Sequence, residues 1–239
     1  MAYKAFLAVW RAGVGSGPYY WVTGFTGSDF KQTDDSYFQI GLRLVAIDIY
    51  DPYDSYSGIW REGTGAQHWD SGLDVDEFKD KDSDQFANGR RLQAIEKDDG
   101  DLMGVWRSGT GTQWWTTGKS WSEFKDKTNN HFAQGLRVSS LIVDDGNPTA
   151  VWRPGTGAQW VHWGLTHAQF VALDTAYFNQ GLRLYAADVY GGNWAAVWRP
   201  GSGAQWVHWG IQLAELKSLD NGYKADGLKM VILKAKQHT

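Results

Sequence analysis

The chain has 239 residues, contains no cysteine and carries a formal net charge of −4 at pH 7. Without cysteine there are no disulfides and no thiol chemistry, and without clustered Lys and Arg to neutralise phosphates we expect no nucleic-acid partner. The first residues lack a basic segment followed by an apolar stretch, and no apolar run approaches the roughly 18 residues of a membrane span. We therefore expect a soluble protein without membrane insertion, either cytoplasmic or secreted by a non-classical route.

A Trp-Arg dipeptide recurs five times along the chain, at spacings of 50, 46, 46 and 46 residues. Its copies are Trp10-Arg11, Trp60-Arg61, Trp106-Arg107, Trp152-Arg153 and Trp198-Arg199. A fixed period of this size indicates tandem structural repeats, in which each repeat buries its apolar face against its neighbours. No Pro- or Ser-rich linker interrupts the period, so we expect one domain of five repeats. Their approximate boundaries are 1–41, 42–89, 90–135, 136–181 and 182–239.

After each Trp-Arg pair the sequence predicts a turn followed by a strand. In copies two to five a Gly-x-Gly turn, a glutamine and an aromatic-rich segment follow one another, and the segment closes on a glycine. The glutamines are Gln67, Gln113, Gln159 and Gln205. The first copy differs, because its glycine loop over residues 13–18 is two residues longer and Tyr19 stands in place of the glutamine.

The next 17 residues of each repeat, up to a further glycine, predict a short amphipathic helix of about three turns. In four repeats a capping side chain stands three residues before an acidic or amide partner, as in a capping box. These capping residues are Thr26, Asp74, Ser120 and Thr166. Two phenylalanines of the helix stand eight residues apart, as Phe30 and Phe38 do, and we expect both rings on one helical face. The closing glycines suit the left-handed conformation that ends a helix.

A partly alternating apolar strand, strand A, follows each helix, for example over residues 41–47 and 181–187. Turn residues such as those at 98–101 then predict a hairpin into strand B, which carries the Trp-Arg pair. The aromatic-rich segment after the Gly-x-Gly turn is strand C. The sequence therefore predicts a mainly β fold with short helices, built as a five-fold pseudo-symmetric repeat of one helix plus a three-stranded antiparallel unit.

The two ends of the chain are complementary. Residues 5–10 form a strand B with no strand A before it, and residues 227–233 form a strand A with no strand B after it. We expect residues 227–234 to pair with residues 4–11, because this covers two exposed apolar edges and closes a propeller-like ring. An open solenoid explains the period equally well but leaves both edges bare.

The 15 tryptophans lead to two expectations. Those of the Trp-Arg pairs should fill one core position per repeat. On strand C, alternation places Trp160 and His162 on one face and Val161 and Trp163 on the other. Both faces cannot lie equally buried beneath one helix, so some indoles should stay partly exposed beside Gln and His.

Exposed indoles beside polar groups suit a carbohydrate, since a pyranose stacks its C–H face on an indole and its hydroxyls pair with planar groups such as Arg and Gln. The predicted ligand-binding residues are Arg61, Gln67, Arg107, Gln113, Trp114, Arg153, Gln159, Trp160, His162, Arg199, Gln205, Trp206 and His208. The arginines could instead form structural ion pairs with Asp48, Glu96 or Asp188, and the glutamines could instead bond to the glycine loop. The arginines directly after the helix, Arg43, Arg91, Arg137 and Arg183, should be held by the helix C-terminus and solvated.

No catalytic constellation stands out, so we expect no enzyme, no catalytic residues, no metal site and no cofactor. The histidines lack cysteine partners and a His-Glu-x-x-His motif, and no serine lies in a Gly-x-Ser-x-Gly motif. The Gly-x-Gly turns lack the later Gly-Lys-Ser/Thr of a P-loop. Carboxylate pairs at 98–99 and 144–145 are explained by hairpin turns.

The repeat resembles a known family. Its pattern of Ala/Gly-Val-Trp, Gly, Gln-Trp, Gly-Leu/Ile, Gln-Phe and Gln-Gly-Leu-Arg-Leu is clearest over residues 149–187 and 195–210. This pattern is similar to the tryptophan-containing bacterial tandem repeat, which also forms the amino-terminal part of fungal polyglycine hydrolases, and more loosely to tectonin-type propeller lectins. The resemblance covers essentially the whole chain and implies a repeat scaffold with a recognition role. It implies no catalytic residue, because the serine-hydrolase domain of the larger proteins is not among these residues.

The sequence therefore predicts a multivalent, lectin-like protein whose partners are glycans or glycoconjugates, including cell-surface glycoproteins. Two alternatives remain open, a scaffold that binds proteins or peptides such as glycine-rich chains, and a structural or self-assembling module. Residues 150–164 and 196–210 differ only at Thr156 and Ser202. Such identity is expected of equivalent binding sites, and recent duplication would also produce it.

Overall fold

The computed structural model describes residues 3–50 and 55–238. Within them, every helix has 13 residues. The helices are α1 (Gly27–Gln39), α2 (Val75–Ala87), α3 (Trp121–Ala133), α4 (His167–Asn179) and α5 (Leu213–Ala225). The strands are β1 (Tyr3–Arg11), β2 (Tyr19–Phe25), β3 (Leu42–Tyr50), β4 (Ser55–Glu62), β5 (Gln67–Leu73), β6 (Arg90–Asp98), β7 (Asp101–Ser108), β8 (Trp114–Thr116), β9 (Leu136–Asp144), β10 (Asn147–Pro154), β11 (Trp160–Leu165), β12 (Leu182–Tyr190), β13 (Asn193–Pro200), β14 (Gln205–Ile211) and β15 (Lys229–His238).

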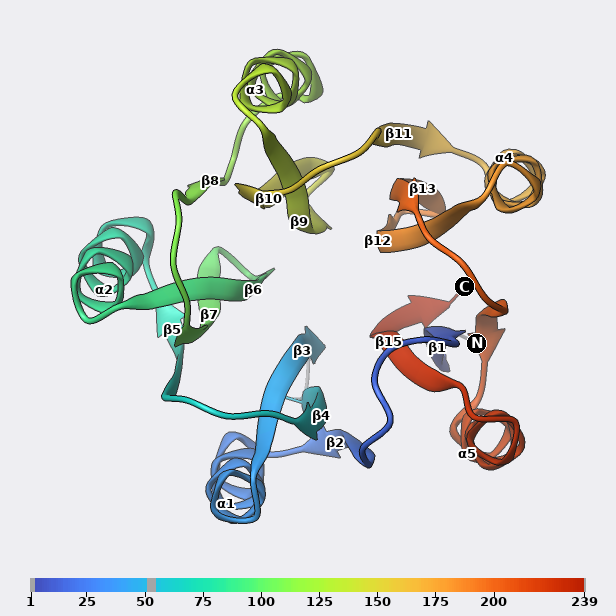
Figure 1. The fold of residues 1–239 in the computed structure, drawn as a ribbon, viewed down its shortest axis with the longest axis horizontal. Helices are drawn as coiled ribbons and strands as arrows, with labels where there is room; N and C mark the ends of the chain where they lie inside the picture. The colour runs from blue at the N-terminus through green and yellow to red at the C-terminus, as the bar shows by residue number, and fades with distance from the viewer. Residues whose placement is uncertain (1–2, 51–54, 239) are drawn as a thin grey trace. The chain divides into compact units, whose positions relative to one another are not determined.

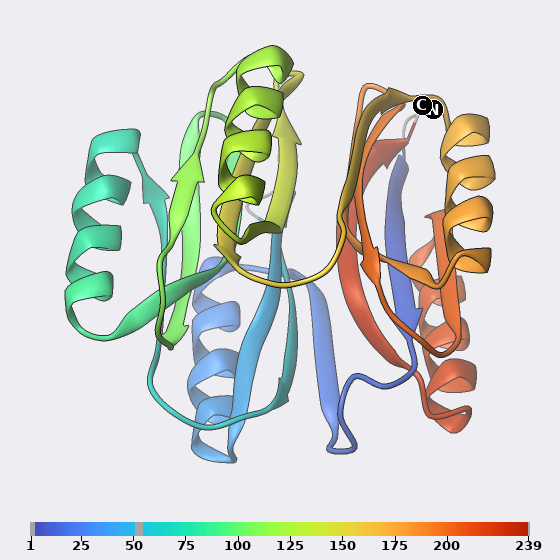
Figure 2. The same cartoon turned by 45° about the horizontal axis from the view of Figure 1, so that its top comes forward.

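The strands form three-stranded antiparallel sheets with strand B always in the centre. We number them sheet I (β2-β4-β3), sheet II (β5-β7-β6), sheet III (β8-β10-β9), sheet IV (β11-β13-β12) and sheet V (β14-β1-β15). Each sheet is packed against the helix that connects its strand C to its strand A, as Figure 2 shows for α3 and sheet III. A sheet with its helix is called a repeat below, with the same numeral. The predicted fold class, a β-rich α+β repeat, is confirmed.

Strand C belongs to a different sheet from the strand B that precedes it in the chain. Strand β8, for example, follows β7 of sheet II but pairs with β10 of sheet III. The Gly-x-Gly loop therefore carries the chain from one sheet to the next, and a repeat runs in the order strand C, helix, strand A, strand B.

The chain divides into two compact units. Unit 1 comprises Met1–Gly65 and Ser202–Thr239 and contains sheets I and V, and unit 2 comprises Ala66–Gly201 and contains sheets II, III and IV. The following contacts all lie within one unit or the other.

Sheet V unites the two ends of the chain. Strand β1 pairs with β15 over the register from Lys4 opposite Gln237 to Arg11 opposite Lys229, and Figure 1 shows these two strands side by side. The predicted pairing of the two chain ends is thereby confirmed, although residues 4–11 pair with residues 229–237 rather than 227–234. In the same unit, the buried Asp48 of sheet I accepts a hydrogen bond from the Ala235 amide of β15 at 2.7 Å.

The helices begin and end as predicted. Thr26, Asp74, Ser120 and Thr166 each cap a helix, and the reciprocal capping-box bond is present in α2, α3 and α4. Helix α5 begins at Leu213, and the side chain of its N-cap residue Gln212 makes no capping bond. The glycines that follow the helices have φ between 71° and 84°, a left-handed conformation that residues with a Cβ adopt only with strain.

The expectation that both helical phenylalanines share one face was wrong. The first ring of each pair is buried in the core, as Phe30 is, whereas Phe38, Phe86 and Phe132 are exposed. Eight residues turn an α-helix by two revolutions plus about 80°, which carries the second ring off the sheet. There it stacks on the guanidinium of the next arginine, with 3.7 Å between Arg43 Cζ and the Phe38 ring centre.

The arginines after the helices bind the helix C-terminus as expected, but three of them are buried rather than solvated. Arg43, Arg137 and Arg183 are at most 8% exposed. Arg137 donates from Nη1 to the carbonyls of Phe132 and Leu136 and from Nε to Gly157 of the glycine loop. Each of these arginines thus joins a helix end to strand A.

The core of each repeat contains the tryptophan of its Trp-Arg pair. Trp10, Trp60, Trp106, Trp152 and Trp198 are at most 1% exposed, which confirms the predicted core position. Four of the five indoles donate their N–H to an aspartate at the eighth position of the helix, and the donor-to-acceptor distances are 2.7–2.9 Å. These aspartates are Asp34, Asp82, Asp174 and Asp220.

Candidate functional site

An exposed aromatic ring recurs on strand C, opposite the core tryptophan. In sheet IV, for example, Trp160 is in register with Trp198. Each such ring lies against an aromatic ring of the helix in the same repeat. We call these pairs the aromatic ledges, and they are Tyr20/Tyr37, Trp114/His131, Trp160/Tyr177 and Trp206/Tyr223, with 5.2–5.9 Å between ring centres. Repeat II has His68 and Gln85 at the two positions instead.

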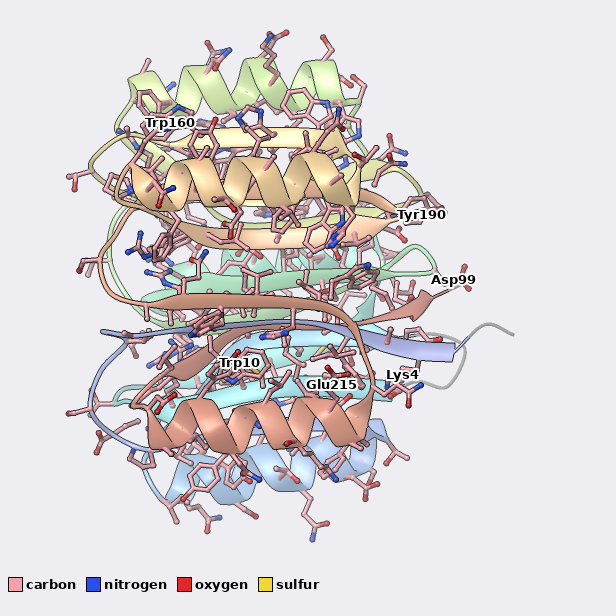
Figure 3. All side chains as sticks on the ribbon, turned by 90° about the vertical axis from the view of Figure 1, so that its right-hand side faces the viewer. Lys4, Trp10, Asp99, Trp160, Tyr190 and Glu215 are labelled. Atoms are coloured by element: carbon pink, nitrogen blue, oxygen red, sulfur yellow. The ribbon has the colours of Figure 1, made fainter. Side chains whose placement is uncertain are left out.

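The ledges leave wide apolar surfaces open to solvent. Trp114 is 51% exposed and Trp206 is 52% exposed, and Trp160 is half-buried. Figure 3 shows Trp160 near the end of sheet IV at which strand C begins, whereas Tyr190 lies at the opposite, hairpin end. The ledge of repeat IV therefore lies beside the Gly-x-Gly loop.

The predicted alternation along strand C brings tryptophan and histidine together at the same helix ring. His162 Nε2 is 2.7 Å from the Tyr177 hydroxyl, and Tyr177 also contacts Trp160. His208, Tyr223 and Trp206 repeat this arrangement, with 2.8 Å between the histidine and the hydroxyl.

The ledges carry neutral rings at pH 7. Burial lowers the pKa of His131, His162 and His208 below the ordinary value, so the imidazoles are deprotonated. Burial also raises the pKa of Tyr177 and Tyr223. The ledges of repeats IV and V thus offer an apolar face with a neutral hydroxyl group at its side.

Two of the predicted arginines, Arg61 and Arg153, connect neighbouring sheets instead. Arg61 of sheet I donates to the Met230 carbonyl of sheet V at 2.6 Å, and Arg153 of sheet III donates to the Leu92 carbonyl of sheet II at 3.3 Å. Burial, and secondarily the nearby Arg11, lowers the pKa of Arg61 to about 10. The alternative structural role therefore has direct support for two arginines, although the partners are carbonyls rather than carboxylates.

Two of the predicted glutamines, Gln113 and Gln159, also connect neighbouring sheets. Gln113 Oε1 accepts from the Leu92 amide at 2.5 Å, and Gln159 Oε1 accepts from the Val138 amide at 2.8 Å. Leu92 and Val138 lie in strand A of the preceding sheet. Gln113 also donates to Asp82. The remaining candidates Gln67, Arg107, Arg199 and Gln205 are half-buried, and the guanidinium of Arg199 lies 4.4 Å from the Tyr185 ring centre.

The acidic residues of strand A bind backbone amides. The buried Asp188 accepts from the amide of Val143 in sheet III and from that of Val189, both at 2.8 Å. Asp48 makes the equivalent bond to Ala235 in unit 1. These carboxylates connect strands A of neighbouring sheets.

Sequence reasoning missed the helix residues of these sites. Position eight of the helix holds the aspartate that binds the core indole, and position eleven holds the helix ring of the ledge. The two recur three residues apart, as in Asp34-x-x-Tyr37, Asp174-x-x-Tyr177 and Asp220-x-x-Tyr223. That spacing was visible in the sequence and would have pointed to them.

Over the described ranges 3–50 and 55–238, no cluster of three or more His, Cys, Asp or Glu side chains could hold a metal ion. In the same ranges, no helix is long and apolar enough to cross a membrane.

Fold and sites together define a tryptophan-rich tandem-repeat protein in which each repeat combines a helix with one β-sheet. Residues 156–200 match the family described as polyglycine hydrolase-like, structural repeat, which confirms the predicted resemblance for that segment. The matched residues run from the glycine loop through β11, α4, β12 and β13, so they span one repeat in the order strand C, helix, strand A, strand B. No curated protein matches the chain.

Proposed function

We propose that the chain is a multivalent carbohydrate-binding protein without catalytic activity, and that its binding sites are the aromatic ledges. The observation that carries the proposal is the recurrence of a strand ring against a helix ring in four of the five repeats. The strand ring is exposed in three of them and half-buried in repeat IV. Apolar surface left open at one structural position in several repeats is costly unless it has a partner.

A sugar suits the chemistry of the ledges. A pyranose presents one face of C–H groups, which stacks on an indole, and its hydroxyls both donate and accept hydrogen bonds. The hydroxyls of Tyr177 and Tyr223 each retain capacity beyond their bond to histidine, because a phenol can both donate and accept. In this proposal the indoles and tyrosines contact the ligand, while Arg153 and Gln159 support the scaffold.

The first prediction concerns the number of sites. A glycan array should identify a bound sugar, and calorimetry with that sugar should give a stoichiometry above one. The double substitution Trp114→Ala and Trp206→Ala should reduce the stoichiometry by the two altered ledges, because loss of a stacking ring costs about 2 kcal/mol per site, roughly 30-fold in affinity.

The matched control is Ile40→Ala, which removes an exposed apolar side chain outside the ledges and should leave binding unchanged. Silence across a broad array, or an unaltered stoichiometry in the folded double variant, would contradict the proposal.

A structural or protein-binding module is the second candidate. Two observations favour it: the contacts of Arg61, Arg153, Gln113 and Gln159 between sheets, and the description of the matched family as a structural repeat. If no glycan binds, the exposed rings would have to serve a macromolecular surface instead.

A further inference from the structure

In repeats II and V a helix carboxylate, half-buried at Asp82 and buried at Asp220, lies where three donors from the strands converge. In repeat II, Asp82 accepts from Trp106 Nε1 at 2.8 Å, from Gln113 Nε2 at 2.7 Å and from Trp115 Nε1 at 3.0 Å. Trp106 belongs to the same repeat, and the other two donors come from the strand C segment of repeat III. Asp220 of repeat V likewise accepts from Trp10, Tyr19 and Trp21.

Repeat III keeps two of these donors but has no carboxylate. Thr128 occupies the eighth position of α3, where the other helices have aspartate, and Val161 replaces the third donor. Trp152 and Gln159 occupy the positions of Trp106 and Gln113. Thr128 Oγ1 and Trp152 Nε1 have no hydrogen-bond partner in the part of the chain that the structure describes, although Thr128 is 8% and Trp152 1% exposed. Two buried polar groups are thus unpaired where a carboxylate is the rule.

A cavity of about 490 Å³ opens beside Thr128, between α3 and strand β11. Thr128, Gln159 and Val161 line it, together with Phe132, Trp163 and Lys125. All these residues belong to unit 2. The volume lies within the range of small-ligand pockets, and it extends beyond the space that one carboxyl group needs.

We propose that this cavity, the repeat III pocket, binds a small molecule through a carboxylate that takes the place of the missing aspartate side chain. The ligand carboxylate accepts from Trp152 Nε1, from the Thr128 hydroxyl and from the Gln159 amide, in the manner of Asp82. Hydrogen bonds to a charged acceptor are about twice as strong as neutral ones. Lys125 adds positive charge at the wall, and Phe132 and Trp163 bound the space for a ring. The pocket is distinct from the ledges and does not depend on the proposed lectin function.

An acidic sugar and an aromatic acid both present this chemistry, so calorimetry on the full chain uses one probe of each kind. Sodium D-glucuronate is compared with D-glucose, and sodium phenylacetate with phenylacetamide. We expect at least one acid to bind with a stoichiometry of one and at least tenfold more tightly than its neutral analogue. If neither acid exceeds its analogue, the proposal is overturned.

The decisive variant is Thr128→Asp, which places a carboxylate of the protein itself at the eighth position of α3. It should weaken acid binding at least tenfold and raise the melting temperature of the ligand-free protein, because the new carboxylate satisfies Trp152. The matched control Thr128→Val removes only the hydroxyl and should weaken acid binding no more than severalfold. Equal loss in both variants, or unchanged binding in Thr128→Asp, would overturn the proposal. Sugar binding at the ledges should be the same in both variants, so the two proposals fail separately.

A measurement on the unaltered chain tests the proposal even if the Thr128→Asp variant misfolds. In a two-dimensional 1H–15N spectrum, the bound acid should shift the indole N–H resonance that Thr128→Val also moves. An acid that shifts only other indoles binds elsewhere and contradicts the assignment.

Discussion

At the scale of single residues, the stability of each repeat depends on how a large buried indole satisfies its one polar atom. An indole N–H left unpaired in the core costs about 1–3 kcal/mol. Asp220 resolves this for Trp10 and also binds Tyr19, Trp21 and Lys224. Burial alone would raise the pKa of Asp220, but the hydrogen bonds from Lys224, Trp10, Tyr19 and Trp21 lower it overall. The ionised form is therefore favoured in the folded protein.

The substitution Asp220→Ala should lower the free energy of unfolding by about 2–4 kcal/mol, because it removes one acceptor from several buried donors at once. Asp35→Ala is the matched control, since Asp35 makes only an exposed ion pair with Lys31 and such pairs contribute little. Denaturant unfolding monitored by tryptophan fluorescence gives both values. Similar stabilities for the two variants would refute the role assigned to Asp220.

At the scale of elements, the histidines connect strand C to the helix and make this contact sensitive to pH. An unfolded histidine has a pKa near 6.5, and burial lowers the pKa of His162 and His208 in the fold. As pH falls through about 6.5, the unfolded chain therefore takes up protons before the folded chain, and stability is lost.

We expect the free energy of unfolding to be smaller at pH 5.5 than at pH 7.5. The double variant His162→Gln and His208→Gln should show a weaker dependence on pH over this window, whereas His167→Gln, which changes an exposed histidine, should retain the full dependence. Denaturant titrations at both pH values test this. A double variant as pH-dependent as the parent would show that these histidines are not the cause.

Local patterns were sufficient to predict the elements themselves. Capping residues such as Ser120 and the glycines after the helices marked the helix ends, and the Trp-Arg period revealed the repeat. The sequence could not predict which sheet strand C joins. A Gly-x-Gly turn has the same residues whether the chain returns to the same sheet or enters the next one. For the same reason the roles of Arg153 and Gln159 were missed, since their partners lie in strand A of another sheet. The common placement of Trp160 and His162 at Tyr177 was predictable, because alternation along a strand is a local property.

At the scale of the molecule, the same contacts recur between neighbouring sheets in both units. In each unit an arginine binds a carbonyl of strand A in another sheet, and an acidic residue of one strand A binds a backbone amide of another. In unit 2, Gln113 binds the same strand A residue as Arg153. Stability in such a repeat protein is approximately a sum over repeats and their interfaces. Sheet V is the exception in connectivity, because its strands come from both ends of the chain.

Deletion of residues 227–239 should therefore damage the N-terminal part as much as the C-terminal part. It removes β15, so β1 loses its partner along the register from Lys4 to Arg11, and Asp48 loses its bond to Ala235. An unpaired, apolar strand edge promotes aggregation. We expect the truncated protein to unfold without a single cooperative transition or to aggregate, as judged by calorimetry and light scattering. Removal of only residues 237–239 is the control and should have little effect, since most of the β1–β15 register remains. Unchanged melting and solubility after the longer deletion would show that pairing of the chain ends does not stabilise the fold.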